Sequence, residues 1–138
     1  MSEVAAPGAL TKKLGIKPGH LAALLNAPEG AAAALEPLPA GATVETTAAT
    51  TPADVVVVFV ENSAAVEAWV PQARAAGKAG GLLWVVYPKG GKKAGTDLNR
   101  DILWELLGVQ GLTGVTLVAY DGTWSAMRFR PTDEVGAR

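Results

Sequence analysis

The sequence predicts an α/β protein: a three-layer αβα sandwich on a doubly wound, mostly parallel sheet with a C-terminal antiparallel hairpin. Segments of strand length alternate along the chain with segments of helical periodicity, which is typical of parallel sheets with helical crossovers. The runs 55–60 and 82–87 are apolar or aromatic at every position, which indicates strands covered on both faces. Asp121-Gly122 then separates two further strand-like runs, and glycine at that place favours a tight hairpin.

The length of 138 residues predicts one domain, which we place at residues 11–131. Residues 1–10 are expected to form a flexible N-terminus, and residues 132–138 a loose C-terminal tail. No apolar run reaches the roughly 18 residues of a membrane-spanning helix, and the N-terminus lacks a signal pattern. We therefore expect a cytoplasmic protein without a membrane partner, either a monomer or a homodimer.

Composition excludes several kinds of chemistry. The formal net charge of −1 provides no global basic field, which argues against a nucleic-acid partner. The absence of cysteine excludes disulfides, thiolate catalysis and cysteine-based zinc sites. A single histidine, His20, excludes a site with several histidine ligands, so we expect no metal.

The N-terminal part is expected to form short elements. Residues 11–15 favour a helical turn, residues 20–26 a first buried strand, and residues 43–46 a polar strand at one edge of the sheet. Between the two strands, Asn26 is expected to cap a short Ala-rich helix. Glu29, three residues later, would complete a capping box.

The middle of the chain predicts a strand followed by a helix. Residues 54–60 are rich in valine and form the most strand-like segment. Asn62 or Ser63 can cap the next helix, in which apolar residues recur at i, i+3, i+4 and i+7 from Val66 onward. Pro71 lies inside this helix and is expected to kink or break it.

A glycine-rich connection over residues 77–81 leads into the second central strand. A loop rich in lysine and glycine follows that strand. Thr96 or Asp97 is expected to cap the next helix, over about residues 98–107, and Gly108 can end it.

The C-terminal part predicts a strand at residues 115–120 and an antiparallel return at residues 124–130. The expected strand order begins 2-1-3-4, with the fifth strand and its antiparallel partner beyond; the partner's place in the sheet stays open. This order has a switch point between the first and third strands, and ligands of such sheets bind outside the carboxyl ends of the strands.

Polar side chains of several loops are expected at that carboxyl edge. Lysines separated by Gly90 and Gly91 could bring positive charge and backbone amides to a ligand, beside a helix N-terminus. We therefore predict a non-catalytic module that binds a small anionic ligand or a protein partner, although a solvated surface loop has the same composition. The candidate ligand-binding residues are Asn26, Glu29, Glu61, Asn62, Lys89, Lys92, Lys93, Thr96 and Trp124.

An enzyme is the alternative. Glu29 or Glu61 could act as an acid together with Lys89 in the edge crevice, as in a small transferase or hydrolase. Acidic residues at helix starts also stabilise the helix dipole without any chemistry, so no catalytic residue is assigned. His20 starts its strand and lies at the opposite edge, which favours a structural role.

Trp104 falls outside the apolar face of its helix, one turn after Arg100. The two side chains could stack as a local cation–π pair. Alternatively, Trp104 and Arg100 could form an exposed contact for a partner subunit.

Two segments resemble class I methyltransferases: Lys17-Pro18-Gly19-His20 before the first strand, and Gly80-Gly81-Leu82-Leu83-Trp84-Val85 at the fourth. The resemblance implies a Rossmann-like sheet. After the first strand, however, the chain reads Asn26-Ala27-Pro28-Glu29-Gly30, where those enzymes carry a glycine-rich cofactor turn. We therefore expect no bound cofactor.

A second resemblance covers about residues 10–131 and is to the bacterial family called domain of unknown function 3052. This resemblance implies a small cytoplasmic bacterial protein without an established activity, so it supplies no catalytic residue. The segments that carry it are Leu14-Gly15-Ile16-Lys17-Pro18-Gly19, Asn26-Ala27-Pro28, Tyr87-Pro88-Lys89, Thr96-Asp97, Arg100-Asp101-Ile102-Leu103-Trp104 and Asp121-Gly122-Thr123-Trp124-Ser125.

Overall fold

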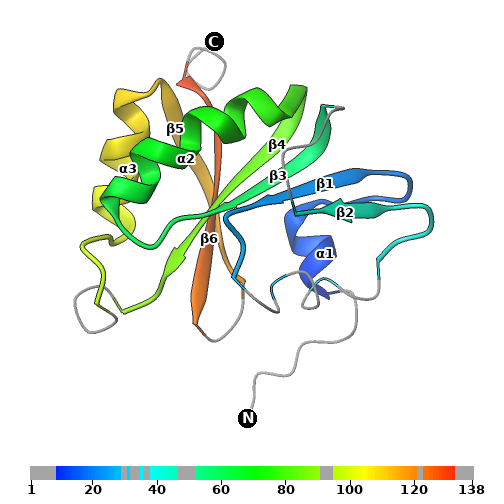
Figure 1. Cartoon of the computed structure of the whole chain (residues 1–138), viewed down its shortest axis with the longest axis horizontal. Helices are drawn as coiled ribbons and strands as arrows, with labels where there is room; N and C mark the ends of the chain where they lie inside the picture. Colours follow the sequence, from blue (N-terminus) through cyan, green and yellow to red (C-terminus); the bar gives the residue numbers. More distant parts are fainter. Residues whose placement is uncertain are drawn as a thin grey trace.

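The computed structural model describes residues 9–28, 31, 35, 38–46, 52–90, 95–120 and 123–132, with residues 9 and 78–80 described by their backbone alone. Within that part of the chain, three helices accompany one six-stranded sheet (Figure 1). The elements are α1 (Ala9–Leu14), β1 (Leu21–Leu25), β2 (Thr43–Glu45), β3 (Ala53–Phe59), α2 (Ser63–Ala76), β4 (Gly77–Pro88), α3 (Arg100–Val109), β5 (Leu112–Ala119) and β6 (Trp124–Pro131).

The strand order is β2-β1-β3-β4-β6-β5. β2, β1, β3 and β4 are parallel to one another, whereas β6 is antiparallel to both β4 and β5. This confirms the α/β class, the mostly parallel sheet, the edge position of β2 and the C-terminal hairpin. The place of the antiparallel strand, which the sequence left open, is between β4 and β5.

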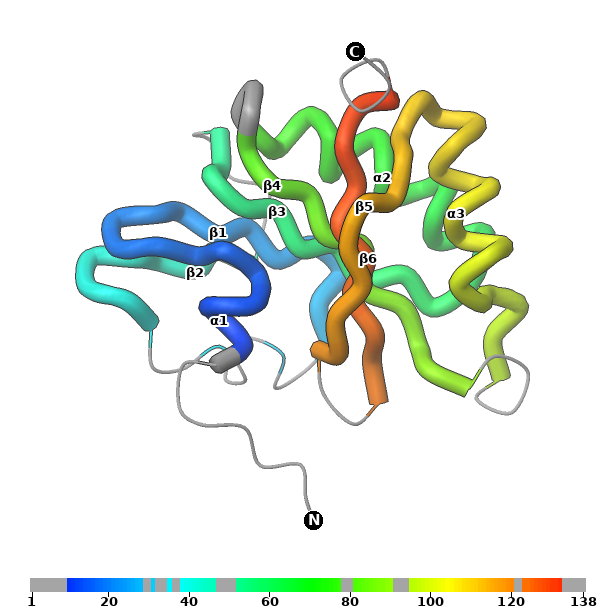
Figure 2. Tube along the Cα trace, turned by 180° about the vertical axis from the view of Figure 1, so that it is seen from behind, coloured from blue at the N-terminus to red at the C-terminus, as the bar shows by residue number. Residues whose placement is uncertain are grey.

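Two apolar cores lie on the two faces of the sheet. The helices α2 and α3 cover one face, with Val66, Val70 and Leu103 in the core beneath them. α1 covers part of the other face, where Leu14 and the buried Leu35 belong to the second core. Figures 1 and 2 show α2 and α3 together on one side of the molecule and α1 apart from them. The three layers therefore agree with the predicted sandwich.

β3 and β4 form the centre of the sheet and are adjacent and parallel, as predicted. Val57 pairs with Trp84 and Val58 with Val85. Successive side chains of a strand point to opposite faces, so Val57 enters the core beside α1 and Val58 the core beside α2 and α3. All four side chains are buried, which explains why the sequence is apolar at consecutive positions.

The N-terminal elements β1 and β2 and the short helix α1 form where the sequence predicts them. His20 lies just before β1, and its Nδ1 accepts a hydrogen bond of 3.1 Å from the Lys17 N–H. Most of the predicted helix after Asn26, including Glu29, lies outside the described residues. The predicted flexible terminus is described only at Ala9 and Leu10, which begin α1, and the predicted tail only at its first residue.

Pro71 does not break α2, which continues through it to Ala76. Of the two outcomes expected at Pro71, a kink or a break, the break is therefore wrong. Gly77 is not in a connecting loop, because it is already the first residue of β4. A Cβ on Gly77 would lie 3.2 Å from a methyl group of Val56, so glycine suits this close junction.

The predicted bounds of the C-terminal elements were also displaced. α3 begins at Arg100 and runs past Gly108 to Val109. Gln110 caps its end, with the Gln110 N–H 3.0 Å from the Leu107 carbonyl oxygen. The residue in the left-handed conformation is Gly111, at φ 84°, and β5 follows directly from Leu112.

Candidate functional site

The carboxyl ends of the parallel strands define the candidate site. β1 has β2 on one side and β3 on the other, so the sheet has the predicted switch point between β1 and β3. α2 follows β3 and α3 follows β4, so both helices begin at this edge (Figure 1). The loops after β1, β3 and β4 therefore decide what the edge can bind.

Thr96 joins the loop after β4 to the loop after β3. Its hydroxyl donates a hydrogen bond to the Glu61 carbonyl oxygen at 2.5 Å and accepts one from the Leu98 N–H at 3.1 Å. Its side chain is buried, with 5% exposed. A buried hydroxyl that uses both its donor and an acceptor position is a structural group, and Thr96 does not cap α3.

Asp97 also contacts the loop after β3. The sequence predicted Asp97 as a possible cap of α3, but it caps α2. Its carboxylate accepts hydrogen bonds from the Ser63 N–H at 2.9 Å and the Ser63 hydroxyl at 2.5 Å. Those bonds, first the one from the hydroxyl, lower the pKa of Asp97 from its ordinary value of 3.8. Asn62 caps α2 as predicted, accepting from the Ala65 N–H at 2.9 Å.

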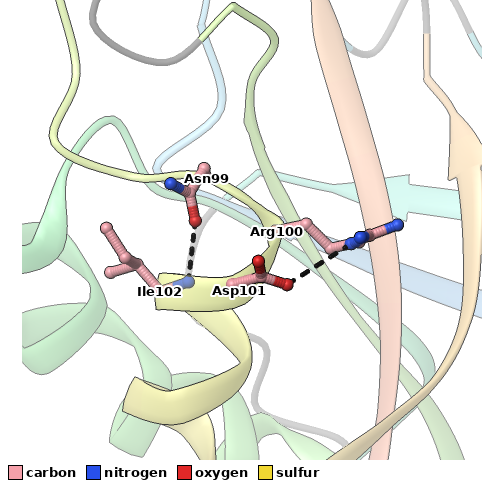
Figure 3. Close-up of polar contacts among 4 residues, drawn as sticks. All are labelled: Asn99, Arg100, Asp101 and Ile102. Atoms are coloured by element: carbon pink, nitrogen blue, oxygen red, sulfur yellow. Dashed lines mark hydrogen bonds and ion pairs between the residues drawn. The ribbon is translucent and has the colours of Figure 1, made fainter.

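The cap of α3 is Asn99, which the sequence reasoning missed. Its side-chain oxygen accepts from the Ile102 N–H at 2.8 Å (Figure 3). The sequence did contain a signal for this cap, because Asn99 stands three residues before the apolar Ile102. Thr96 and Asp97 are also good capping residues, and they were preferred. Arg100 and Asp101 form an exposed ion pair of 3.6 Å in the first turn (Figure 3).

Asn26 bonds across the carboxyl edge of the sheet. Its backbone has φ 56°, and its side-chain Nδ2 donates to the Phe59 carbonyl oxygen at 2.8 Å. The capping box predicted for it involves Glu29, which lies outside the described residues. Asn26 thus connects the carboxyl end of β1 to that of β3, across the switch point. Asparagine enters the left-handed region more readily than most residues, which explains why it can occupy a turn without glycine.

Trp124 belongs to an aromatic cluster at the same edge. Its ring packs edge-on against Phe59, with centroids 5.4 Å apart, and the ring of Tyr120 also packs edge-on against Phe59, with centroids 5.2 Å apart. The Tyr120 hydroxyl donates to the Ala31 carbonyl oxygen at 2.8 Å. Trp124 is half-buried beside the core, so it supports the edge. Sequence reasoning missed Phe59 and Tyr120, whose positions at strand ends were the available signal.

Among the candidate ligand-binding residues that the structure describes, Lys89 and Glu61 are charged and exposed. The Lys89 N–H donates to the Thr123 carbonyl oxygen at 2.9 Å, which fixes its backbone beside the hairpin. Gly90 follows with φ 94°, a conformation that favours glycine. Glu29, Lys92 and Lys93 lie outside the described residues.

Trp104 lies away from this edge, on the side of α3 that faces β5. A Cβ on Gly114 would lie 2.7 Å from its ring nitrogen, so the ring rests directly on the strand while 48% of the residue stays exposed. Beside it is a hollow of about 340 Å³. Its lining residues are Arg100, Asp101, Trp104, Gly114, Val115, Thr116, Leu117 and Met127.

Tyr87 is the buried titratable group near α3. Burial raises the pKa of its hydroxyl, and the Arg100 guanidinium opposes that change. Among the described residues, no three histidine, cysteine or acidic side chains gather where they could hold a metal ion. No described helix is long and apolar enough to cross a membrane.

Comparison with solved structures identifies the fold. A SAM-dependent methyltransferase from Aquifex aeolicus superimposes with a TM-score of 0.60 and 10% identity, over 87% of this chain and 86% of that one. A ribosomal protein L11 methylase from Lactobacillus delbrueckii gives 0.57 and 10%, over 88% and 74%. The tRNA methyltransferase TrmK of B. subtilis gives 0.52 and 12%, over 96% and 70%.

These likenesses show a Rossmann-like sheet of the class I methyltransferase kind, with C-terminal antiparallel strands. At such low identity they show the fold alone. No protein-family profile and no curated protein sequence matches the chain.

Proposed function

We propose that the protein is a non-catalytic module that binds a small anionic ligand at the carboxyl edge of its sheet, with Lys89 as the main contact. The observation that carries the proposal is the position of Lys89. Its backbone is held to Thr123 between β4 and the hairpin, while its side chain is exposed. An ammonium on a fixed backbone presents a compact positive charge to an anion, and Gly90 next to it leaves the backbone accessible.

The helix starts contribute less than the sequence suggested. Asp97 takes the first amide of α2, and Asn99 takes an amide of α3. The Leu98 N–H is bonded to Thr96. The ligand would therefore be held by Lys89 and the loop after it, to which Lys92 and Lys93 belong, and we expect weak binding that salt screens readily.

An NMR titration with inorganic phosphate and ATP at low salt tests this proposal. Shifts should concentrate at Lys89, Gly90 and the neighbouring Thr123, and they should weaken in Lys89→Ala. Lys17→Ala is the matched control, because it removes the same charge from an exposed position before β1, at the opposite edge. Equal titrations of the parent and Lys89→Ala, or no shifts at millimolar ligand, would leave the loop a solvated connection.

A small transferase is the second candidate, and the methyltransferase-like fold favours it over a hydrolase. Glu61, exposed after β3, or Glu29 would act as the acid beside Lys89 in the edge crevice. Asn26 stands where a glycine-rich cofactor turn would lie and bonds to Phe59 across the switch point, which argues against this candidate. Calorimetric titration with S-adenosylmethionine decides: clear binding would replace the binding module by a transferase.

We also propose membership of the family called domain of unknown function 3052, which rests on the motifs Asn26-Ala27-Pro28 and Arg100-Asp101-Ile102-Leu103-Trp104. That membership implies a small cytoplasmic bacterial protein and supplies no catalytic residue. An alignment with the family in which these two segments stay unmatched would contradict it.

A further inference from the structure

The two edges of the sheet differ in how well they are protected. β2 forms one edge with three residues and ends in the charged Glu45. β5 forms the other edge with eight residues, Leu112–Ala119, and carries no charged residue and no proline. Natural edge strands are usually short, charged or interrupted, because their free backbone groups can pair with another strand.

The direction of the hydrogen bonds shows which backbone groups face that open edge. The Tyr120 N–H donates to the Trp124 carbonyl oxygen at 3.0 Å, across the hairpin toward β6. Residues of an antiparallel ladder bond to alternate sides. The N–H and C=O groups of Ala119 and Leu117 therefore point away from β6, on the outer side of the last strand that the structure describes.

Large exposed apolar side chains gather beside the same edge. Leu117 lies on the face covered by α3, because its ladder partner Met127 belongs to the core beneath α2 and α3. Trp104 extends from α3 onto Gly114 of β5. All five exposed large apolar residues of the described chain lie on α3 and β5: Ile102 (38%), Trp104 (48%), Val109 (88%), Val115 (39%) and Leu117 (46%).

We propose that β5 pairs with β5 of a second copy of this chain, antiparallel and about a two-fold axis perpendicular to the sheet. Such an axis joins the two sheets into one and keeps both α3 helices on the same face. Trp104 and Leu117 of each copy then lie next to the axis, and the hollow of about 340 Å³ beside them is covered by the other copy.

Charge favours a second copy as the occupant. In an isologous interface the groups next to the two-fold axis meet their own counterparts, so a charge near that axis would repel itself. β5 has no charge, and Arg100 at the rim is paired with Asp101 within its own chain. The formal net charge of −1 adds little repulsion between two copies.

Sedimentation equilibrium from micromolar to millimolar concentration tests the dimer, with amide hydrogen exchange as a second measurement. The parent should approach twice the mass of the chain, and exchange at Leu117 and Ala119 should slow by about tenfold between the dilute and the concentrated sample. Leu117→Lys should remain at the monomer mass, because it places two ammonium groups at the axis. Thr43→Lys adds the same charge to the other edge strand and should keep the parent's dimer.

Circular dichroism shows whether each variant is folded, and the exchange measurement on the parent holds even if Leu117→Lys does not fold. A parent of monomer mass at every concentration would overturn the proposal. So would a dimer that Leu117→Lys leaves intact, or one that Thr43→Lys dissociates. Exchange at Leu117 and Ala119 that does not change with concentration would overturn it as well.

Discussion

The central strands β3 and β4 and the loops at their carboxyl ends lie next to each other, yet different interactions hold them. In the strands, valine side chains such as Val57 and Val58 are fully buried, and each contributes about 1.5–3 kcal/mol by burial. In the loops, Thr96 and Asp97 contribute individual hydrogen bonds. The bond from the buried Thr96 hydroxyl is worth about 0.5–1.5 kcal/mol. Polar residues at a predicted ligand edge can therefore be occupied in joining loops to one another.

The largest effect is expected in the strands. Val57→Asp places a carboxylate in the core beside α1, without a partner. Such a group costs several kcal/mol against a typical total stability of about 5–15 kcal/mol, so the variant should not fold. Thermal melting followed by circular dichroism measures this. Thr43→Asp, at an exposed position on β2, should melt like the parent, and a soluble Val57→Asp with a cooperative melt would contradict the comparison.

An intermediate effect is expected where the two loops are joined. Thr96→Val keeps the shape of the side chain but leaves the Glu61 carbonyl and the Leu98 N–H without the hydroxyl. The free energy of unfolding, from urea denaturation, should fall by about 1–3 kcal/mol. Thr113→Val is the control, because its hydroxyl bonds to Thr132 at an exposed place and its loss should change little. Equal losses of unfolding free energy in both variants would show that the buried Thr96 hydroxyl stabilises the fold no more than the exposed Thr113 hydroxyl.

The Asp97–Ser63 contact should make the free energy of unfolding depend on pH in the acid range. The pKa of Asp97 in the folded protein is lowered by hydrogen bonds from Ser63, so its contribution is fully present above the unfolded value of about 3.8. That contribution declines as the pH falls from there through the lower folded value. Urea midpoints at several pH values should therefore show a smaller acid-induced loss for Asp97→Asn than for the parent.

Ser63→Ala removes the hydroxyl donor and keeps the Ser63 N–H, so it should reduce the acid dependence in the same direction as Asp97→Asn, but by less. Asp101→Asn is the control, since it removes a carboxylate that contacts Arg100 and leaves the Asp97–Ser63 hydrogen bonds in place, so the acid dependence due to Asp97 should remain. Superimposable profiles for the parent and Asp97→Asn would show that the Ser63 contact has no energetic consequence.

The smallest effect is expected for Glu61→Gln. The backbone carbonyl of Glu61, and not its carboxylate, accepts the bond from Thr96, and the side chain is exposed. The free energy of unfolding should therefore change by no more than about 0.5 kcal/mol. A larger loss in urea denaturation would show that the Glu61 carboxylate also stabilises the contact between the loops after β3 and β4.

The same comparison explains what the sequence could predict. Val55 to Val60 are apolar at every position because both faces of β3 are covered, and this information is local to the strand. The partner of Asp97 is not local, because Ser63 is 34 positions away in the chain and is brought near only by the sheet. A rule that considers only neighbouring residues therefore predicted Asp97 as a possible cap of α3, whereas it caps α2.

The elements of the candidate site illustrate the same limit. Asn62 caps the helix that directly follows it, so its role could be read from the sequence. The bond from Asn26 to Phe59 depends on the positive φ of Asn26 and on the distance between two strand ends, which no local pattern encodes. The place of β6 was undetermined for a similar reason, because a hairpin can join a sheet by either of its strands.

The position of β6 between β4 and β5 determines when the sheet can be completed during synthesis. β5 is made before β6, but β6 is its neighbour in the sheet and separates it from β4. While residues 124–131 are still in the ribosome, β5 has no strand to pair with and the outer side of β4 is open. We expect a chain stopped at residue 123 to bind chaperones, which hold incomplete sheets, and the full chain to be released from them.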